Sequence, residues 1–311
     1  MKRLTSVSAV VPVYNSEESL QLLCDELSAA LSEVSDTWEI LLVNDGSVDG
    51  SWSVIRDLSS KEPSVWGINL WRNFGQHPAL LCGVRRARSE FVVTLDDDLQ
   101  YHPRDIPKLV AAMGDGVDVV YGRSRHTEHG LWRRVASRVL RWALEMAVGV
   151  SVARSASPFR LFRTSIRDGF REYAGPHVSL EVLLAWSARG FGVAEVDHQA
   201  RRVGKSQYTV AKLFGHAFDL ITGFSPRPLQ FASFIGLAFT LIGVVVLVFV
   251  VSRFFIAGGS VPGFPFLASI IAIFSGVQLF TLGIFGQYLG RVHQRSLDRP
   301  TYVVREDTLK G

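Results

Sequence analysis

Short apolar runs rich in β-branched residues alternate with helical patterns over the first two-thirds of the chain. Strands alternating with amphipathic helices are typical of a mainly parallel sheet with helices on both faces. The sequence therefore predicts an α/β domain over residues 1–227. The expected strands are "VSAVVPVY", "WEILLVN", "VWGINL", "FVVTL" and "VDVVYG", with helices over residues 17–31 and 105–113.

The last quarter of the chain carries two long apolar stretches. No charged residue stands between Arg227 and Arg253, or between Arg253 and Arg291. Residues 231–252 and 264–288 each exceed the roughly 20 apolar residues that a bilayer-spanning helix needs, and buried core helices rarely run so long without a charge. The sequence predicts two transmembrane helices over residues 228–290, followed by a tail over residues 291–311.

Basic residues surround this hairpin unevenly. The connector between the stretches has at most Arg253 at its edge, whereas Arg and Lys gather before and after the pair. Cytoplasmic loops carry such an excess, so we expect a multi-pass inner-membrane protein with the α/β domain and both termini cytoplasmic. Small residues in the spans permit close helix packing and a homo-oligomer. The N-terminal apolar run is too short for a signal peptide and indicates a first strand.

Composition agrees with a membrane-anchored protein that faces a reducing compartment. Hydrophobic residues make up 48% of the 311 residues and charged residues 20%, and the apolar excess lies in the two C-terminal stretches. The two cysteines, Cys24 and Cys82, lack metal-ligand spacing, which favours a reducing compartment. Eleven arginines and three acidic residues lie between Arg123 and Arg171. This excess indicates an anionic partner such as phosphate or lipid headgroups, or a solvated basic face, and no nucleic acid is expected.

Polar clusters follow four of the expected strands. They read "YNSEE", "NDGSVDGS", "WRNFGQH" and "DDDLQ". Ligands of open α/β sheets bind beyond the carboxyl ends of the strands, so we expect the site there. Neither GxGxxG nor GxxxxGK[ST] occurs, which disfavours dehydrogenases and P-loop kinases.

Three consecutive carboxylates stand after the run "FVVTL". In an extended strand Asp96 and Asp98 would share one face, and Asp97 would be a bystander on the other. Two carboxylates on one face suit Mg²⁺ or Mn²⁺, which bind few protein carboxylates and bridge to phosphates. Such an ion would neutralise a departing diphosphate. The alternative is a polar turn that caps the following helix.

Four segments, "VVPVYNSEESL", "LLVNDGSVDGS", "RNFGQHPALLCGVRRA" and "VVTLDDDLQYHPRDIPKLV", closely resemble glycosyltransferase family 2. They are most similar to its polyprenyl-phosphate branch, which includes dolichyl-phosphate mannose synthase and bacterial undecaprenyl-phosphate sugar transferases. The resemblance covers nearly the whole chain. It implies a GT-A fold and metal-dependent, inverting transfer of a sugar from a nucleotide sugar, expected to be UDP-linked, to a polyprenyl phosphate. GDP-mannose is the alternative donor.

The resemblance also implies roles for individual residues, matched motif by motif. Asp96, Asp98 and Gln100 would hold the metal, and Asp96, Asp98, Arg202 and Lys205 would act in catalysis. The donor would be bound by Pro12, Tyr14, Val43, Asp45, Asp96, Asp97 and Arg123.

One departure concerns the catalytic base. Some relatives have an Asp directly before the "FRL" segment, where this chain has Pro158, preceded by Ser157. A lipid phosphate carries roughly −1.5 to −2 charge and is itself a nucleophile, so the missing Asp favours a phosphate acceptor over a hydroxyl. Glu181 is a partnered carboxylate or a base, and His77 is expected to cap or pack at a helix start. The acceptor phosphate would be bound by Arg133, Arg134, Arg138 and Arg160.

Two rival functions fit the sequence less well. A processive polysaccharide synthase is disfavoured because the chain has no Q-x-x-R-W motif and only two expected spans. An idle membrane scaffold is disfavoured because Asp45, Asp96 and Asp98 are all in place. The sequence leaves open which sugar is moved.

Overall fold

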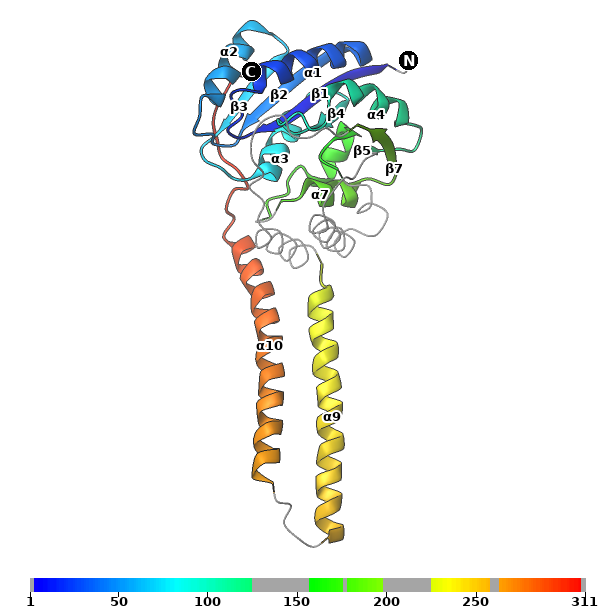
Figure 1. The fold of residues 1–311 in the computed structure, drawn as a ribbon, viewed down its shortest axis with the longest axis vertical. Coiled ribbons are helices and arrows are strands. Elements are labelled where there is room, and N and C mark those ends of the chain that lie inside the picture. The colour runs from blue at the N-terminus through cyan, green and yellow to red at the C-terminus, as the bar shows by residue number, and fades with distance from the viewer. Residues whose placement is uncertain (1–2, 125–156, 176–177, 198–224, 258–262, 309–311) are drawn as a thin grey trace.

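The computed structural model describes residues 3–124, 157–175, 178–197, 225–257 and 263–308 (Figure 1). In these parts of the chain, one eight-stranded sheet has the order β7-β5-β6-β4-β1-β2-β3-β8. The strands are β1 (Leu4–Val13), β2 (Ser35–Asn44), β3 (Val65–Leu70), β4 (Phe91–Thr94), β5 (Val119–Ser124), β6 (Arg160–Arg163), β7 (Phe191–Val196) and β8 (Val304–Asp307).

The centre of the sheet is parallel. β1 pairs in parallel with β2 and β4, and β2 with β3, while β6 runs antiparallel between β4 and β5. Val10 of β1 lies opposite both Leu41 of β2 and Thr94 of β4, so these strands end at the same edge. The apolar run of β1 is buried on both faces, as expected of a strand covered by helices on each side.

Helices cover both faces of the sheet and form two hydrophobic cores. On one face lie α1 (Leu20–Val34), α2 (Ser51–Lys61) and α4 (Ile106–Ala112). The other face packs against α3 (Gln76–Arg86), η2 (Thr164–Phe170) and α7 (Leu180–Ser187). A short η1 (Pro103–Asp105) precedes α4. The predicted α/β class is confirmed.

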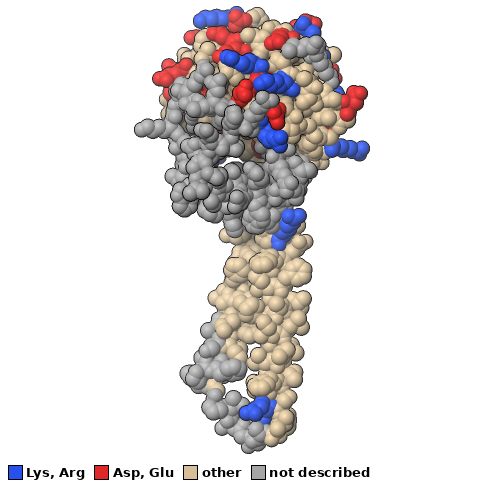
Figure 2. Space-filling view, turned by 45° about the vertical axis from the view of Figure 1, so that its right-hand side comes forward, with Lys and Arg blue, Asp and Glu red and all other residues tan. Residues whose placement is uncertain are grey.

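Two long helices project together from the α/β domain (Figure 1). They are α9 (Arg227–Ala257) and α10 (Phe264–Ser296), each longer than the predicted span. The rings of Phe239 and Phe274 meet edge to face at 5.8 Å. Both helices are long and apolar enough to cross a membrane, and many of their large apolar side chains are exposed. Figure 2 shows charged side chains over the α/β domain and almost none along the two helices.

The chain returns to the sheet after α10. β8 pairs antiparallel with β3 at the sheet edge, with Asn69 opposite Glu306. An ion pair of 2.6 Å joins Asp307 to Arg86 of α3. The sequence predicted only a tail here, because β8 is too short and too polar to be recognised as a strand. This pairing ties the residues after the hairpin to the α/β domain.

Candidate functional site

A cavity of about 240 Å³ opens at the carboxyl ends of the parallel strands. Its wall comes from the loops after β1, β2, β3 and β4, as expected from the fold. The lining residues are Pro12, Val13, Tyr14, Asp45, Asn73, Gly75, Gln76, Asp96, Asp97 and Asp98.

All three consecutive aspartates line this cavity. The prediction that Asp97 faces away from Asp96 and Asp98 is wrong. β4 ends at Thr94, so the three residues belong to a turn and do not alternate as in a strand. The positive φ of 56° at Leu99 closes this turn. The carboxylates therefore gather on one side of the loop.

Asp97 joins the loop after β4 to the loop after β1. Its Oδ2 accepts hydrogen bonds from the Tyr14 N–H at 3.1 Å and from the Ser16 hydroxyl. The Ser19 hydroxyl donates to the Asp97 carbonyl oxygen at 3.0 Å. Burial raises the pKa of Asp97, although the two bonds to its carboxylate oppose this. Asp97 thus holds two walls of the cavity together.

Asp96 carries a strongly perturbed carboxyl group. Burial raises its pKa to about 7, with further contributions from the charges of Asp98 and Asp97, while Arg160 lowers it. Gln76 of α3 donates to Asp96 Oδ1 at 2.6 Å. Carboxylates crowded in this way favour a cation between them.

A divalent ion fits these oxygens. Within the described ranges, no three or more His, Cys, Asp or Glu side chains form a cluster that could hold a metal alone. Mg²⁺ commonly takes only one or two carboxylates and completes its shell with water and substrate phosphates, so Asp96 and Asp98 are a suitable donor pair. Gln100 does not line the cavity, and its backbone N–H donates to Asp98 Oδ1 at 3.1 Å.

Asp45 organises the loop after β3. Its two carboxylate oxygens accept from the backbone N–H groups of Phe74 at 2.7 Å and Gly75 at 2.8 Å. Burial raises the pKa of Asp45, opposed by these two bonds and by the charge of Arg72. The loop approaches Gly46 closely, since a Cβ there would lie 2.4 Å from the Arg72 carbonyl carbon. Asp45 therefore shapes the cavity as well as lining it.

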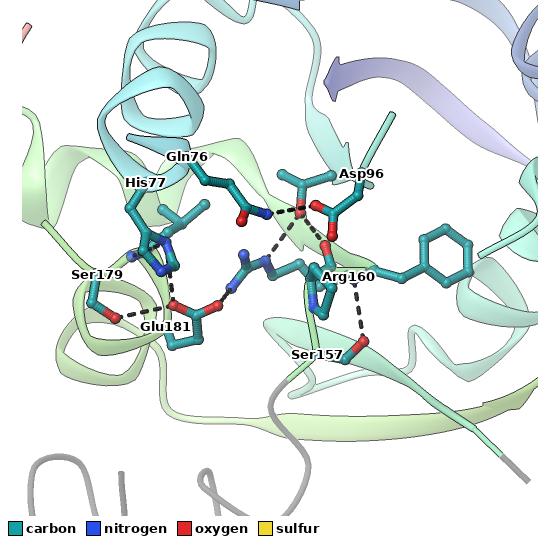
Figure 3. Close-up of polar contacts among 11 residues, drawn as sticks. Gln76, His77, Asp96, Ser157, Arg160, Ser179 and Glu181 are labelled. Atoms are coloured by element: carbon teal, nitrogen blue, oxygen red, sulfur yellow. Dashed lines mark hydrogen bonds and ion pairs between the residues drawn. The ribbon is translucent and has the colours of Figure 1, made fainter. Parts of the chain in front are cut away.

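A buried ionic network lies beside Asp96 (Figure 3). Arg160 of β6 is fully buried, its Nε donates to the Thr94 hydroxyl at 3.0 Å, and its Nη1 lies 3.0 Å from Glu181 Oε1. The other Glu181 oxygen accepts from the Ser179 hydroxyl at 3.0 Å and lies 3.5 Å from His77 Nδ1. The network thus connects β4, β6, α3 and α7.

The network keeps the Glu181 carboxylate ionised. Burial alone would raise the pKa of Glu181, but the charges of His77 and Arg160 outweigh it and lower the pKa to about 2. A carboxylate held ionised this strongly is a weak proton acceptor. Of the two sequence interpretations, the partnered carboxylate is the one that the structure supports. Arg160 was predicted to bind the acceptor phosphate, and the structure places it in this buried pair.

The remaining predicted residues lie away from the cavity or outside the described residues. Val43, fully buried in the core, and Arg123, exposed on β5, are not among the residues that line the cavity. Asn73, Gly75 and Gln76 do line it and were not singled out, although their segment "WRNFGQH" had been recognised as a polar cluster. Outside the described residues are Arg133, Arg134, Arg138, Arg202 and Lys205.

The segment that contains the cavity loops matches a known protein family. Residues 8–168, more than half of the chain, match the family model described as Glycosyl transferase family 2. The chain belongs to glycosyltransferase family 2. The match includes the second half of β1, all of β2 to β4 and all the cavity loops of this glycosyltransferase.

Similar proteins extend the match to nearly the full chain. This glycosyltransferase is 34% identical over 303 residues to an undecaprenyl-phosphate 4-deoxy-4-formamido-L-arabinose transferase of Aeromonas hydrophila, covering 96% of the chain and 93% of the relative. Transferases of the same name from Proteus mirabilis and Pseudomonas aeruginosa are 32% and 34% identical. The alignments cover 98% and 96% of the chain, and 94% and 89% of those relatives.

Solved structures show the same GT-A fold. The α/β domain is similar to glucosyl-3-phosphoglycerate synthase from Mycobacterium tuberculosis in complex with Mn²⁺, UDP and phosphoglyceric acid. That comparison has a TM-score of 0.52 and 19% identity, and covers 70% of this chain and 76% of the synthase. A complex of the same synthase with Mg²⁺ and UDP gives a TM-score of 0.51, again at 19% identity, and covers 70% of this chain and 77% of the synthase.

Proposed function

We propose that this glycosyltransferase moves a sugar from a UDP-linked donor to a polyprenyl phosphate at the cytoplasmic leaflet of the inner membrane. The observation that carries the proposal is the combination, in one chain, of the aspartate-lined cavity and an exposed apolar hairpin. The near full-length likeness to undecaprenyl-phosphate sugar transferases supports a lipid phosphate acceptor.

The donor would lie across the strand ends. Pro12, Tyr14 and Asp45 would face the nucleoside, and Asp96 and Asp98 would hold Mg²⁺ or Mn²⁺. Bound there, the ion would neutralise the negative charge of the diphosphate as the glycosidic bond breaks. Gln76 and Asp97 keep the aspartate loop in place through their hydrogen bonds.

The acceptor would need no side-chain base. A phosphate oxygen already carries negative charge, so it can attack the anomeric carbon while the bond to the nucleoside diphosphate breaks on the opposite face. One-step displacement inverts the anomeric configuration. Arg202 and Lys205, with the basic stretch from Arg133 to Arg138, are proposed to bind the phosphates, because guanidinium and ammonium groups stabilise phosphate oxygens.

The hairpin would fix the catalytic domain at the leaflet that holds the lipid, which raises the effective concentration of the acceptor. Its orientation can be tested with single cysteines at Arg253, near the far end of α9, and at Ser296, at the end of α10. The native cysteines are buried and should react slowly. An impermeant maleimide should label Arg253→Cys in intact spheroplasts and Ser296→Cys only after lysis. The reverse pattern would overturn the orientation.

The transfer itself is tested with membranes that contain the full chain. They are incubated with undecaprenyl phosphate and a panel of labelled UDP- and GDP-sugars, and the lipid phase is extracted. Label in the lipid phase that EDTA and Asp98→Asn abolish would support the proposal. Transfer from a GDP-sugar only would correct the donor, and no lipid-linked label with any donor would refute the proposed reaction.

A further inference from the structure

The C-terminal strand β8 makes polar contacts that reach beyond the sheet edge. Glu306 lies opposite Asn69 of β3, and its Oε1 accepts a hydrogen bond from Asn69 Nδ2 at 3.1 Å. Asn69 is only 5% exposed and Asn44, beside it on β2, only 2%. A carboxylate on the edge strand β8 thus contacts a buried amide of β3, the next strand of the sheet.

A chain of hydrogen bonds leads from this amide to the donor cavity. Asn44 Nδ2 donates to Asn69 Oδ1 at 2.8 Å, and the Ser47 hydroxyl donates to Asn44 Oδ1 at 2.5 Å. The Asn15 N–H donates to the Ser47 oxygen at 3.0 Å. Asn15 directly follows Tyr14, and Asn44 directly precedes Asp45, and both Tyr14 and Asp45 line the cavity.

The four hydrogen bonds have the same direction. In each of them the acceptor is the residue nearer to Glu306 along the series. A carboxylate can only accept hydrogen bonds, whereas an amide both donates and accepts. Glu306 therefore determines which end of the Asn69 amide faces β8, and that choice orients Asn44 in turn. Hydrogen bonds aligned head to tail also strengthen one another inside a protein.

Asn15 ends this chain of bonds with a left-handed backbone, a conformation that Asn adopts more readily than most residues other than glycine. Its φ of 53° lies in the left-handed region, which costs free energy for a residue other than glycine. The Asn15 side chain in turn accepts from the Val48 N–H at 2.9 Å. The loops after β1 and β2 are thereby locked to each other beside the cavity.

β8 and Val303, the residue directly before it, also contact the loop after β3. The Val303 carbonyl accepts from the Trp71 N–H at 3.0 Å, and the Arg305 guanidinium lies 5.2 Å from the centre of the Trp71 ring. Trp71 begins the loop that carries Asn73 and Gly75. The strand that follows the membrane hairpin therefore contacts, directly or through one chain of bonds, three of the four loops around the cavity.

We propose that Glu306 is a positioning residue of the donor site, through which β8 orders the loops that hold the nucleotide. The inference rests on the proposed donor function of the cavity. It makes the segment after the hairpin part of the donor-binding structure. Loss of the carboxylate should weaken nucleotide binding more than it slows the transfer step.

The test compares three variants of the full-length protein in detergent, with UDP and Mg²⁺ as the probe. Glu306→Ala removes the terminal acceptor, and we expect about fivefold weaker UDP binding by calorimetry, with a rise in donor KM larger than the fall in kcat. Glu306→Gln keeps an acceptor oxygen and should bind UDP within about twofold of wild type. Asp307→Ala is the matched control. Asp307 is on the same strand as Glu306, and its loss removes the ion pair with Arg86 of α3 but none of the four hydrogen bonds that lead to the cavity.

The outcomes distinguish a failure of the role proposed for Glu306 from a failure of the proposed donor site. Asp307→Ala should lower the melting temperature as much as Glu306→Ala and leave UDP affinity unchanged. Equal UDP affinity in Glu306→Ala and wild type would overturn the inference, and so would equal weakening by both alanine variants. If wild type binds neither UDP nor GDP, the donor site itself fails, and the inference fails with it.

Discussion

Arg160 Nη1 and Glu181 Oε1 lie 3.0 Å apart inside the α/β domain, beside Asp96 of the aspartate-lined cavity (Figure 3). The pair joins the central sheet, through β6, to α7, which is outside it. Arg160 also contributes positive charge that lowers the pKa of Asp96. The ion pair therefore supports both the packing of the domain and the electrostatics of the site.

Removing the acidic partner should destabilise the domain strongly. Glu181→Gln leaves the Arg160 guanidinium buried without a countercharge, and breaking one partner of a buried pair costs about 3–5 kcal/mol. Urea unfolding of the full chain in detergent, followed by tryptophan fluorescence, measures the loss. Glu195→Gln, on the exposed side of β7, is the control. An unchanged midpoint for Glu181→Gln would show that the pair does not stabilise the protein.

The lowered pKa of Glu181 predicts that the protein loses stability in acid. The pKa of Glu181 is lowered from 4.5 to about 2 in the folded chain. A group with a lowered folded pKa stabilises the protein above its unfolded pKa, and this stabilisation is lost as the pH falls from about 4.5 toward 2. Roughly 3 kcal/mol should disappear over that range. Unfolding measured at pH 7, 4.5 and 3 should show a steeper acid loss in wild type than in Glu181→Gln, and parallel curves would contradict this.

Activity should depend on the aspartate loop. We expect Asp98→Asn to lower kcat by about 10²- to 10³-fold, because charge stabilisation at the departing diphosphate is lost. The variant should also need more Mg²⁺ for its residual activity. Asp49→Asn is the matched control, since Asp49 lies on the neighbouring loop, contacts Ser51 and does not line the cavity. Transfer of label into lipid over a Mg²⁺ titration is the measurement, and equal effects of both variants would argue against a metal at Asp98.

The close approach of two cavity loops at Gly46 should tolerate no side chain. Gly46 has a φ of 66°, and a Cβ would lie 2.5 Å from the Asn73 nitrogen as well as against Arg72. Gly116 has a similar φ of 76° but nothing within 4 Å of its Cβ position. Gly116→Ala should lower the free energy of unfolding by only about 1 kcal/mol, the cost of a left-handed backbone. Gly46→Ala should lower it clearly more and should also weaken UDP binding. Equal unfolding free energies for the two variants would show that the loop moves aside freely.

The regular elements of the sheet were predictable because their signals are local. An apolar run such as Val65–Leu70 can be buried on both faces only in a covered strand, and the structure has β3 with the same bounds. The positions of the polar loops followed from the parallel order of the strands. The length of the two apolar stretches likewise sufficed for the hairpin.

Short-range periodicity and composition were enough to predict the fold class, the strand ends that carry the aspartates and the pair of apolar helices. The other features of the site depend on long-range packing. The turn after Thr94 brings Asp97 into the cavity, Arg160 is paired with Glu181, and Glu306 meets Asn69 across 237 residues. Such contacts depend on how distant segments pack, and no local pattern of residues specifies them.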